Sequence, residues 1–309
     1  MWKYIVFAFC SLLVFAAAPP PSETHRYRTD YEYNKRTNAF YKLHIEVNRY
    51  GRSQDVCRIE GAQLMVPSTD EDIAQLHGMF KYYPDLGDYV WVGNDGQQHE
   101  SAEVSPIIDL TRLESMMDNS DLLDATGCDV VTRKGEIDTL PCYHRLPFIC
   151  KVEAKDAPYD RHCDVYGKDY RYYQSVGSCY AIPKIPYSWP QAYDDCQAQG
   201  AHLVVLNSQA EHDAVYNLTN TEPHVPGARA YYFFFAGYRA DVPVGNATVV
   251  FKTIFNQTLE EAGYNGWSEN EPNNAQGREY CGSIFKNDGK LNDLECAHEF
   301  GYICEKEVH

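Results

Sequence analysis

A polar stretch near the carboxyl end of the chain carries the side chains best suited to binding a ligand. It runs from Glu271 to Cys281, and a second polar stretch ends at Cys296. If these two cysteines are bonded, the disulfide draws together three carboxylates and two amide oxygens, those of Glu271, Asn273, Glu279, Asn292 and Asp293. Calcium takes oxygen ligands of these kinds and, at open positions, hydroxyl groups from outside the protein. The residues therefore predict a calcium site open to a hydroxyl-bearing ligand.

Two simpler interpretations stand beside this one. The tripeptide Glu271-Pro272-Asn273 alone indicates only a turn, because Pro and Asn are ordinary turn residues. Its combination with the other ligand types and with two cysteines favours calcium. A structural calcium that holds the loops without binding a sugar is the alternative.

The amino terminus predicts a secretory signal peptide over residues 1–18. Lys3 supplies the positive charge, residues 4–15 the apolar run and residues 16–18 the small side chains before a proline cluster. The apolar run is too short to span a membrane, and no later stretch is long and apolar enough. An uncleaved anchor or a buried helix is the alternative. We therefore expect a secreted, extracellular protein.

Cysteine usage and charge agree with that compartment. Of eleven cysteines, Cys10 lies in the signal peptide, which leaves ten for five disulfides and no Cys-x-x-Cys pair for zinc or redox chemistry. The net charge of −17 opposes nucleic-acid binding, which needs a basic face. Three glycosylation sequons, expected on surface loops, begin at Asn217, Asn246 and Asn256.

The chain contains an internal duplication. Cys57 followed by Gly61-Ala62-Gln63-Leu64 matches Cys196 followed by Gly200-Ala201-His202-Leu203, and a Ser-x-x-Glu box begins a helix in each copy, at Ser68 and Ser208. We predict domain 1 over residues 27–152, a linker over 153–162 and domain 2 over 163–307. Each copy predicts an opening strand, two helices, a core strand and closing cysteines.

The repeat also suggests how the cysteines pair, although sequence alone leaves the connectivity open. One scheme treats both copies alike, with an outer pair, an inner pair and an additional amino-terminal pair in the second copy. It joins Cys57 to Cys150, Cys128 to Cys142, Cys196 to Cys304, Cys281 to Cys296, and Cys163 to Cys179.

Together these residues resemble the C-type lectin domain: a helix cysteine, Gly-Ala-x-Leu, a Trp-x-Gly strand at Trp91, then the Glu271-Pro272-Asn273 loop and the Asn292-Asp293 pair. A secreted chain with two such domains is similar to the tandem immulectins of insect blood. The resemblance implies an α+β fold, in which each domain has two helices on a twisted, mainly antiparallel sheet with a long loop region. It also implies Ca²⁺ as cofactor and recognition of microbial surface polysaccharides, with lipopolysaccharide or the haemocyte surface as further partners in haemolymph.

The resemblance carries over closely to domain 2. It implies that Glu271, Asn273, Glu279, Asn292 and Asp293 bind both calcium and sugar, and that Pro272 is a cis-proline. Leu291 and Phe235 stand where the family usually has tryptophan, and both are expected in the core. An auxiliary calcium site is disfavoured, because Asn274 and Tyr280 occupy positions that need acids.

The order Glu-Pro-Asn implies selectivity for the hydroxyl pair of mannose, N-acetylglucosamine (GlcNAc) or glucose, whereas Gln-Pro-Asp accompanies galactose in the family. Two vicinal hydroxyls bind the calcium, donate to carboxylates and accept from amide NH₂ groups. Glu271 and Glu279 are the expected acceptors, and Asn273 and Asn292 the expected donors.

Domain 1 departs from the family pattern. Counted back from its cysteines, the equivalent positions hold two acids and no proline, and they are Asp118, Ser120, Thr126, Asp138 and Thr139. We expect no calcium there, and a surface for protein contact or for a calcium-independent ligand.

No motif indicates an enzyme, since the chain lacks a His-Glu-x-x-His zinc motif and a Gly-x-Ser-x-Gly elbow. We expect solvated positions for Glu211-His212 and Asp194-Asp195, and core packing for the aromatic run 231–235. Tyr264 and Trp267 have two interpretations, core packing or stacking on a sugar ring. The rival functions are a protein-binding adaptor with structural calcium only, favoured by insensitivity to sugars, and an enzyme or inhibitor, favoured by activity that survives chelation.

Overall fold

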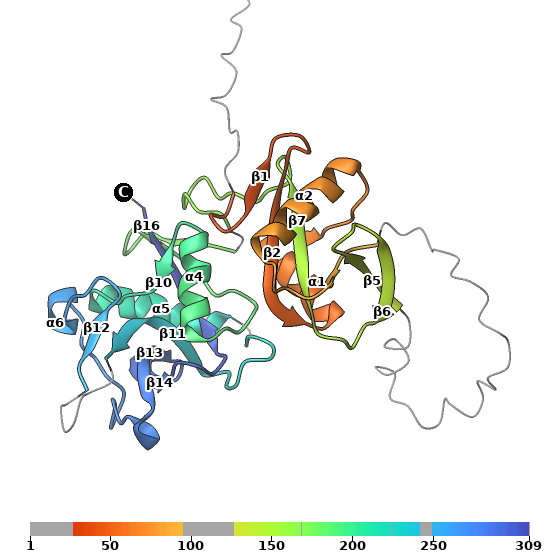
Figure 1. Cartoon of the computed structure of the whole chain (residues 1–309). Coiled ribbons are helices and arrows are strands. Elements are labelled where there is room, and N and C mark those ends of the chain that lie inside the picture. The colour runs from red at the N-terminus through yellow and green to blue at the C-terminus, as the bar shows by residue number, and fades with distance from the viewer. Residues whose placement is uncertain (1–26, 95–126, 168, 223, 242–248, 309) are drawn as a thin grey trace, which may run out of the picture.

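The computed structural model describes residues 27–94, 127–167, 169–222, 224–241 and 249–308, which form two mixed α and β halves (Figure 1). In domain 1 the chain forms one sheet and two helices. The elements are β1 (Glu32–Asn34), β2 (Ala39–Asn48), α1 (Tyr50–Glu60), β3 (Gln63–Leu64), α2 (Asp70–Tyr82), β4 (Tyr89–Trp91), β5 (Gly127–Thr132), β6 (Ile137–Pro141) and β7 (Leu146–Glu153).

The sheet of domain 1 has the strand order β1-β2-β7-β4-β5-β6, with β3 paired to β7. Only β4 and β7 run parallel among the described strands of this sheet; the other pairs are antiparallel. The long pair β2–β7 therefore joins the beginning of the domain to its end.

Domain 2 repeats this plan with its strands divided between two sheets, ordered β10-β16-β9-β8 and β12-β11-β13-β14, with β15 parallel to β11. Its strands are β8 (Arg171–Tyr173), β9 (Ser178–Ala181), β10 (His202–Leu203), β11 (Phe233–Ala240), β12 (Phe251–Thr253), β13 (Glu279–Phe285), β14 (Leu291–Glu295), β15 (Gly301–Tyr302) and β16 (Cys304–Glu307). Its helices are α4 (Trp189–Ala198), α5 (Gln209–Thr221), α6 (Leu259–Ala262) and the 3-10 turn η2 (Ala275–Gly277).

The second helix of each domain begins with a side-chain cap. In domain 2 the hydroxyl of Ser208 accepts from the Glu211 backbone N–H, as the Ser-x-x-Glu pattern predicts. In domain 1 the prediction is wrong by one residue: Thr69, not Ser68, caps α2 and accepts from Asp72. Either hydroxyl suits the position, and Ser68 instead donates to the Asp72 carboxylate at 3.4 Å.

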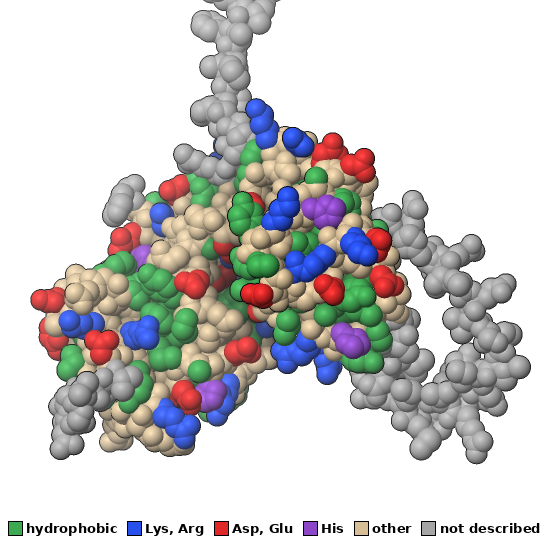
Figure 2. Space-filling model, in the orientation of Figure 1, with side chains coloured by type: hydrophobic (Ala, Val, Ile, Leu, Met, Phe, Trp, Pro, Cys, Tyr) green, Lys and Arg blue, Asp and Glu red, His purple; other side chains and the backbone are tan. Residues whose placement is uncertain are grey.

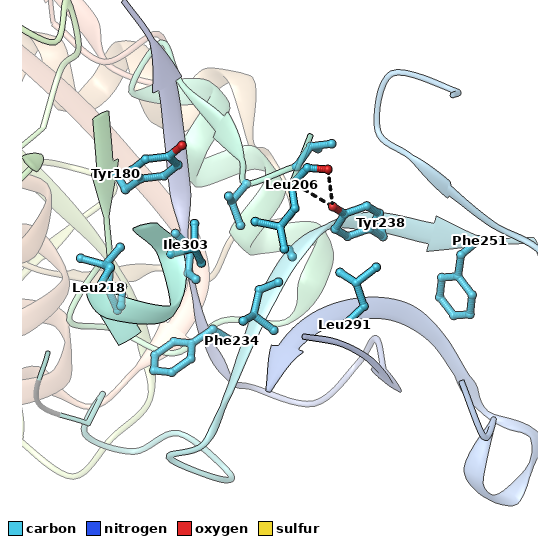
Figure 3. Packing of buried hydrophobic residues seen from close by; sticks show 14 of the residues in the cluster. Tyr180, Leu206, Leu218, Phe234, Tyr238, Phe251, Leu291 and Ile303 are labelled. Carbon is cyan, nitrogen blue, oxygen red and sulfur yellow. Dashed lines mark hydrogen bonds between the residues drawn. The ribbon is translucent and has the colours of Figure 1, made fainter. Parts of the chain in front are cut away.

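The core of domain 2 packs aromatic and aliphatic side chains from both sheets and from α5 (Figure 3). Leu291 and Phe235 are fully buried, as expected of residues that replace tryptophan. The Tyr238 hydroxyl donates to the Leu206 carbonyl and accepts from the Leu206 N–H. The aromatic run 231–235 enters the strand only at Phe233, and Tyr231 before it is 62% exposed, so the prediction of a core strand is wrong for that residue.

Five disulfides cross-link the chain, and each lies within one domain. Their pairs are those that the repeat suggested. They join Cys57 to Cys150, Cys128 to Cys142, Cys163 to Cys179, Cys196 to Cys304, and Cys281 to Cys296. In each domain the outer bridge connects the first helix to the last strand, and the inner bridge lies beside the paired strands that follow the long loop.

A buried ionic contact connects the two domains. Arg28 of domain 1 lies 2.8 Å from a carboxylate oxygen of Asp195 on α4 and 3.6 Å from one of Glu60 on α1. Asp195 also accepts from the Tyr302 hydroxyl at 2.7 Å and from the Gln199 amide at 2.6 Å. The expectation that Asp195 is solvated is therefore wrong, because α4 presents it to residues distant in sequence.

Backbone and apolar contacts accompany this ion pair. The Thr29 N–H donates to the Ala198 carbonyl at 3.0 Å. Ile185 of domain 2 is buried in the same apolar cluster as Tyr27 and Tyr31 of domain 1. The two domains thus share an interface made of buried polar and apolar side chains. No helix within the described ranges is long and apolar enough to cross a bilayer.

Candidate functional site

The β13–β14 pair positions two of the predicted ligands. Asn292 lies opposite Ser283, and Asp293 lies opposite Gly282. The Asp293 side chain is 1% exposed, and the Asn292 amide donates to the Asp293 carbonyl at 2.5 Å. Because Leu291 anchors the start of β14 in the core, this part of the site is held by regular structure.

The loop that precedes β13 brings Glu271 and Asn273 to Asp293. The Glu271–Pro272 peptide bond is cis, as predicted. The Asn273 N–H lies 3.1 Å from Asp293 Oδ1 and 3.1 Å from Glu271 Oε2, and the Asn274 N–H donates to Asp293 Oδ2 at 2.7 Å. Asp293 therefore organises the loop through backbone donors on both of its oxygens.

Glu279, at the start of β13, borders the other end of this loop. One carboxylate oxygen accepts from the Ala275 N–H at 2.8 Å, and the Glu279 N–H donates to the Asn274 side-chain oxygen at 3.0 Å. The Tyr280 hydroxyl donates to the Gly277 carbonyl at 2.9 Å. Asn274 and Tyr280 thus make hydrogen bonds within the loop itself.

The electrostatics of the loop favour a cation. Burial, followed by the hydrogen bond and charge of Asp293, raises the pKa of Glu271 to about 7. Burial, together with the charges of Asp293 and Glu295, also raises the pKa of Glu279. Among the described residues, no Lys or Arg forms an ion pair with these carboxylates. The donor set of carboxylate and amide oxygens without a basic partner therefore fits calcium.

A tighter set of metal-ligating atoms occurs in domain 1 but is not a metal site. Atoms of His44, Glu60 and Cys150 lie within 4.8 Å of one another, the one such group within the described ranges. The Cys150 sulfur is bonded to Cys57, and both nitrogens of His44 face carboxylates, those of Glu46 and Glu60. The group is therefore fully engaged in protein contacts.

The equivalent positions of domain 1 differ in their surroundings. On β6, Asp138 lies opposite Val130 of β5, and Thr139 lies opposite Asp129 of β5. Asn292 and Asp293 occupy the corresponding positions of the β13–β14 pair in domain 2. Both β6 residues are exposed, and the Asp138 carboxylate accepts from the adjacent Thr139 N–H. The other three predicted positions lie outside the described residues, and they are Asp118, Ser120 and Thr126.

Sequence reasoning missed a second carboxylate pair in domain 2. Glu211 and Glu305 are both buried, and the Tyr180 hydroxyl lies 2.5 Å from Glu211 and 3.5 Å from Glu305. Burial and the charge of Glu211 raise the pKa of Glu305 well above its ordinary value. The expectation of a solvated Glu211-His212 face is wrong, because His212 is also buried and contacts the Asp288 carbonyl at 3.0 Å.

Tyr264 and Trp267, for which the sequence allowed two interpretations, each contact another ring of domain 2. The Tyr264 ring stacks on His212 with centroids 5.5 Å apart, and Trp267 meets Phe251 at 5.0 Å. Of the sequons, Asn256 lies in an exposed turn, whereas Asn217 is exposed on helix α5 and not on a loop as predicted. The Thr at the third position of the sequon does not break a helix, so the sequon does not predict a loop. Asn246 lies outside the described residues.

Comparison with known families and proteins agrees with this architecture. The Lectin C-type domain family matches residues 46–152 and 185–306. The hemolymph lipopolysaccharide-binding protein of Periplaneta americana is 35% identical over 130 residues, which are 42% of this chain and 49% of that protein. The hepatic lectin of Gallus gallus is 26% identical over 146 residues, 47% of this chain and 62% of the lectin. The match spans less than two thirds of each relative.

Solved structures that match this chain cover less than half of it. The cow CD23 carbohydrate-recognition domain, described in the presence of a GlcNAc2Man3 oligosaccharide, is 24% identical with a TM-score of 0.36, and the match covers 46% of this chain and 95% of that one. The SPL-1–GlcNAc complex is 20% identical with a TM-score of 0.37, covering 48% and 100%. With two family matches over most of its length, the chain belongs to the C-type lectin family, whose domains bind carbohydrate and are not enzymes.

Proposed function

We propose that this protein is a secreted, calcium-dependent lectin that binds mannose- and GlcNAc-type glycans through domain 2. The observation that carries the proposal is the convergence of Glu271, Asn273 and Asp293 behind the cis-proline, with no basic side chain of the described chain to balance the carboxylates. The cockroach relative is named for lipopolysaccharide binding, which supports microbial surface polysaccharides as the natural partners.

The proposed mechanism assigns each side chain a task. Glu271, Asn273, Glu279, Asn292 and Asp293 would hold the calcium through their oxygens. The ion, when bound, supplies coordination positions for two vicinal hydroxyls of a sugar. Glu271 and Glu279 accept hydrogen bonds from those hydroxyls, and the amide groups of Asn273 and Asn292 donate to them.

Exposure supports this division for three of the four side chains assigned to the sugar, whereas the fourth, Asn292, is buried. Pro272 and Asn273 are exposed and Glu271 and Glu279 are half-buried, so these side chains border solvent where a glycan can approach. Asp293 is buried beneath them and engages the backbone of the loop. The buried carboxylate thus holds the loop, while the more exposed groups are available to the ligand.

Retention on mannose-agarose tests the proposal. We expect the protein to bind the resin with calcium, to elute with a chelator and to pass through galactose-agarose. The Asn292→Ala/Asp293→Ala variant should pass through both resins, since it lacks two ligands. Passage of the wild-type protein through the mannose resin would overturn the mannose assignment.

Exchange of two loop residues tests specificity within the same scaffold. Glu271→Gln/Asn273→Asp keeps a ligand atom at both positions but reverses the order of carboxylate and amide. We expect retention to move from mannose-agarose to galactose-agarose, with calcium dependence preserved. Calcium binding without retention on any sugar resin would favour a protein-binding adaptor.

A further inference from the structure

One edge of domain 1 carries three arginines without acidic partners. Arg49 precedes helix α1 as its N-cap, Arg52 lies in the first turn of that helix, and Arg145 precedes β7. Across the described ranges, none of the three forms an ion pair. The guanidinium of Arg145 contacts the Val47 carbonyl at 3.4 Å, which leaves its charge without compensation.

The fold brings these residues together. Asn48 pairs with Leu146, so the end of β2 lies beside the start of β7. The Tyr50 N–H donates to the Cys142 carbonyl at 3.2 Å, so the turn before β7 lies against the start of α1. Figure 2 shows blue and purple side chains gathered at the lower edge of domain 1. We call Arg49, Arg52, Tyr143, His144 and Arg145 the arginine edge.

The arginine edge combines charge with an aromatic surface. The rings of Tyr143 and His144 stack with centroids 4.9 Å apart, and both side chains are exposed. Val47, on the neighbouring strand, is 44% exposed and adds apolar surface. An exposed ring pair flanked by guanidinium groups offers a face for a sugar ring and donors for its charged substituents.

Two of the three acids near this edge have basic partners outside it. The Glu46 carboxylate lies 2.7 Å from the His44 ring, and Asp55 is paired with Arg58 at 2.8 Å. Asp129 lies close enough to Tyr50 to raise the pKa of its hydroxyl, although burial is the larger cause. The first turn of α1 contains no acidic residue. Local positive charge thus persists on a chain whose net charge is −17.

We propose that the arginine edge binds the anionic groups of a polysaccharide, such as phosphate, sulfate or carboxylate, independently of calcium. A guanidinium group can donate two parallel hydrogen bonds to such an anionic group, and the stacked rings offer a flat surface for the attached sugar. The net negative charge of the chain disfavours nucleic acid. In domain 1, the described positions that correspond to the calcium ligands are exposed and lack the family's ligands. The arginine edge gives this domain a ligand surface of its own, which does not depend on the site in domain 2.

The test uses the full-length chain in the presence of a chelator, so that a calcium site makes no contribution. The probe is immobilised dextran sulfate, with uncharged dextran as the neutral comparison. We expect binding to dextran sulfate alone, weakened by sodium chloride because exposed charges are screened. The variant Arg49→Gln/Arg52→Gln/Arg145→Gln should bind about tenfold more weakly.

A second triple variant separates position from charge. Lys35→Gln/Arg36→Gln/Lys134→Gln removes three exposed basic residues from the β1–β2 and β5–β6 turns, so its net charge changes equally. It should bind like the wild-type protein. An equal loss in both variants, or no binding by the wild type, would overturn the proposal. So would binding restricted to phosphatidylglycerol vesicles, which would make the partner a lipid surface.

Discussion

Domains 1 and 2 place different charges at the same point of one fold. In domain 1, Asp72 of α2 is paired with Lys151 at 2.9 Å, and the Tyr41 hydroxyl donates to it at 2.7 Å. In domain 2, Glu211 of α5 faces Glu305 beneath the Tyr180 hydroxyl. Lys151 and Glu305 each follow the last cysteine of their domain. The change from Lys151 to Glu305 therefore replaces a salt bridge by a pair of facing carboxyl groups.

Strands β6 and β14 differ in the same sense. Asp138 and Thr139 of domain 1 are exposed, whereas Asn292 and Asp293 of domain 2 are buried below Glu271. Domain 1 thus pairs the buried Asp72 with its own Lys151. Domain 2, over its described residues, gathers carboxylates that lack a Lys or Arg partner at both places. Duplication kept the scaffold and changed the charge balance.

The largest effect is expected from a substitution at the ion pair between the two domains. Arg28→Met leaves the buried Asp195 carboxylate without its cation. We expect a loss of about 4 kcal/mol in the free energy of unfolding, measured by urea denaturation. The matched variant Arg36→Met, at an exposed turn, should change it by about 0.5 kcal/mol or less. Similar effects of both variants would show that Arg28 does not hold the interface.

Matched variants of the two loops test whether only one binds calcium. Asn292→Ala/Asp293→Ala should weaken calcium binding about a hundredfold, which corresponds to about 2.7 kcal/mol, because two ligands are lost. Asp138→Ala/Thr139→Ala should leave it unchanged. Calcium titration followed by intrinsic fluorescence measures both. A comparable loss in the domain 1 variant would assign calcium to both loops.

Lys151→Met tests the salt bridge of domain 1. It leaves Asp72 buried with hydrogen bonds from the Tyr41 and Ser68 hydroxyls but without a charge partner. We expect the free energy of unfolding to fall by about 2 kcal/mol. Lys134→Met is the exposed control. If both lysine variants unfold at the same urea concentration as the wild type, Lys151 does not stabilise the domain.

The pH dependence of calcium binding tests the charge balance of domain 2. The raised pKa of Glu271, about 7, means that the metal-free fold retains a proton there more readily than the unfolded chain does. The stability contribution of Glu271 to the metal-free protein therefore falls as pH rises from about 4.5 to 7. Calcium needs the ionised carboxylate, so its affinity should be about tenfold weaker at pH 6 than at pH 8. A flat profile would contradict this.

The smallest expected effect comes from Glu305→Gln. It removes the buried carboxyl group whose pKa burial and the charge of Glu211 raise, while its amide oxygen can still accept from the Val205 N–H, which donates to Glu305 at 3.1 Å. The melting temperature of the calcium-free protein should rise by about 3 °C at pH 8. His202, 4.0 Å away, is the nearest basic ring. Exposed Glu307→Gln is the control, and a lower melting temperature for Glu305→Gln would show that the buried carboxyl pair does not destabilise the fold.

Local pattern predicted much of this molecule. The cysteine spacing and the repeat gave the pairs Cys57–Cys150 and Cys196–Cys304 because cysteines have few possible partners. The hydroxyl at Ser208 marked a helix start because capping is a contact within four residues. The ligand identities at Glu271 and Asp293 came from the resemblance, and their assignment to calcium is still a prediction.

Contacts across long sequence separations escaped prediction. Asp195 was expected in solvent, yet its partner Arg28 lies 167 residues away. His212 was expected on an exposed helical face, yet it contacts the carbonyl of Asp288, 76 residues away. The sequence of an amphipathic helix indicates which apolar side chains are buried. Burial of a polar side chain can be predicted only when the element packed against it is known.

The order of the disulfides along the chain determines how the protein responds to a protease. A single cut between Cys57 and Cys150, or between Cys196 and Cys304, leaves both pieces joined by the outer bridge. A cut between Cys163 and Cys179 does the same. Only a cut in the segments 151–162 or 180–195, or outside the bridged region, releases a fragment on a non-reducing gel. Limited proteolysis can therefore nick the lectin's loops while the recognition domains stay covalently whole.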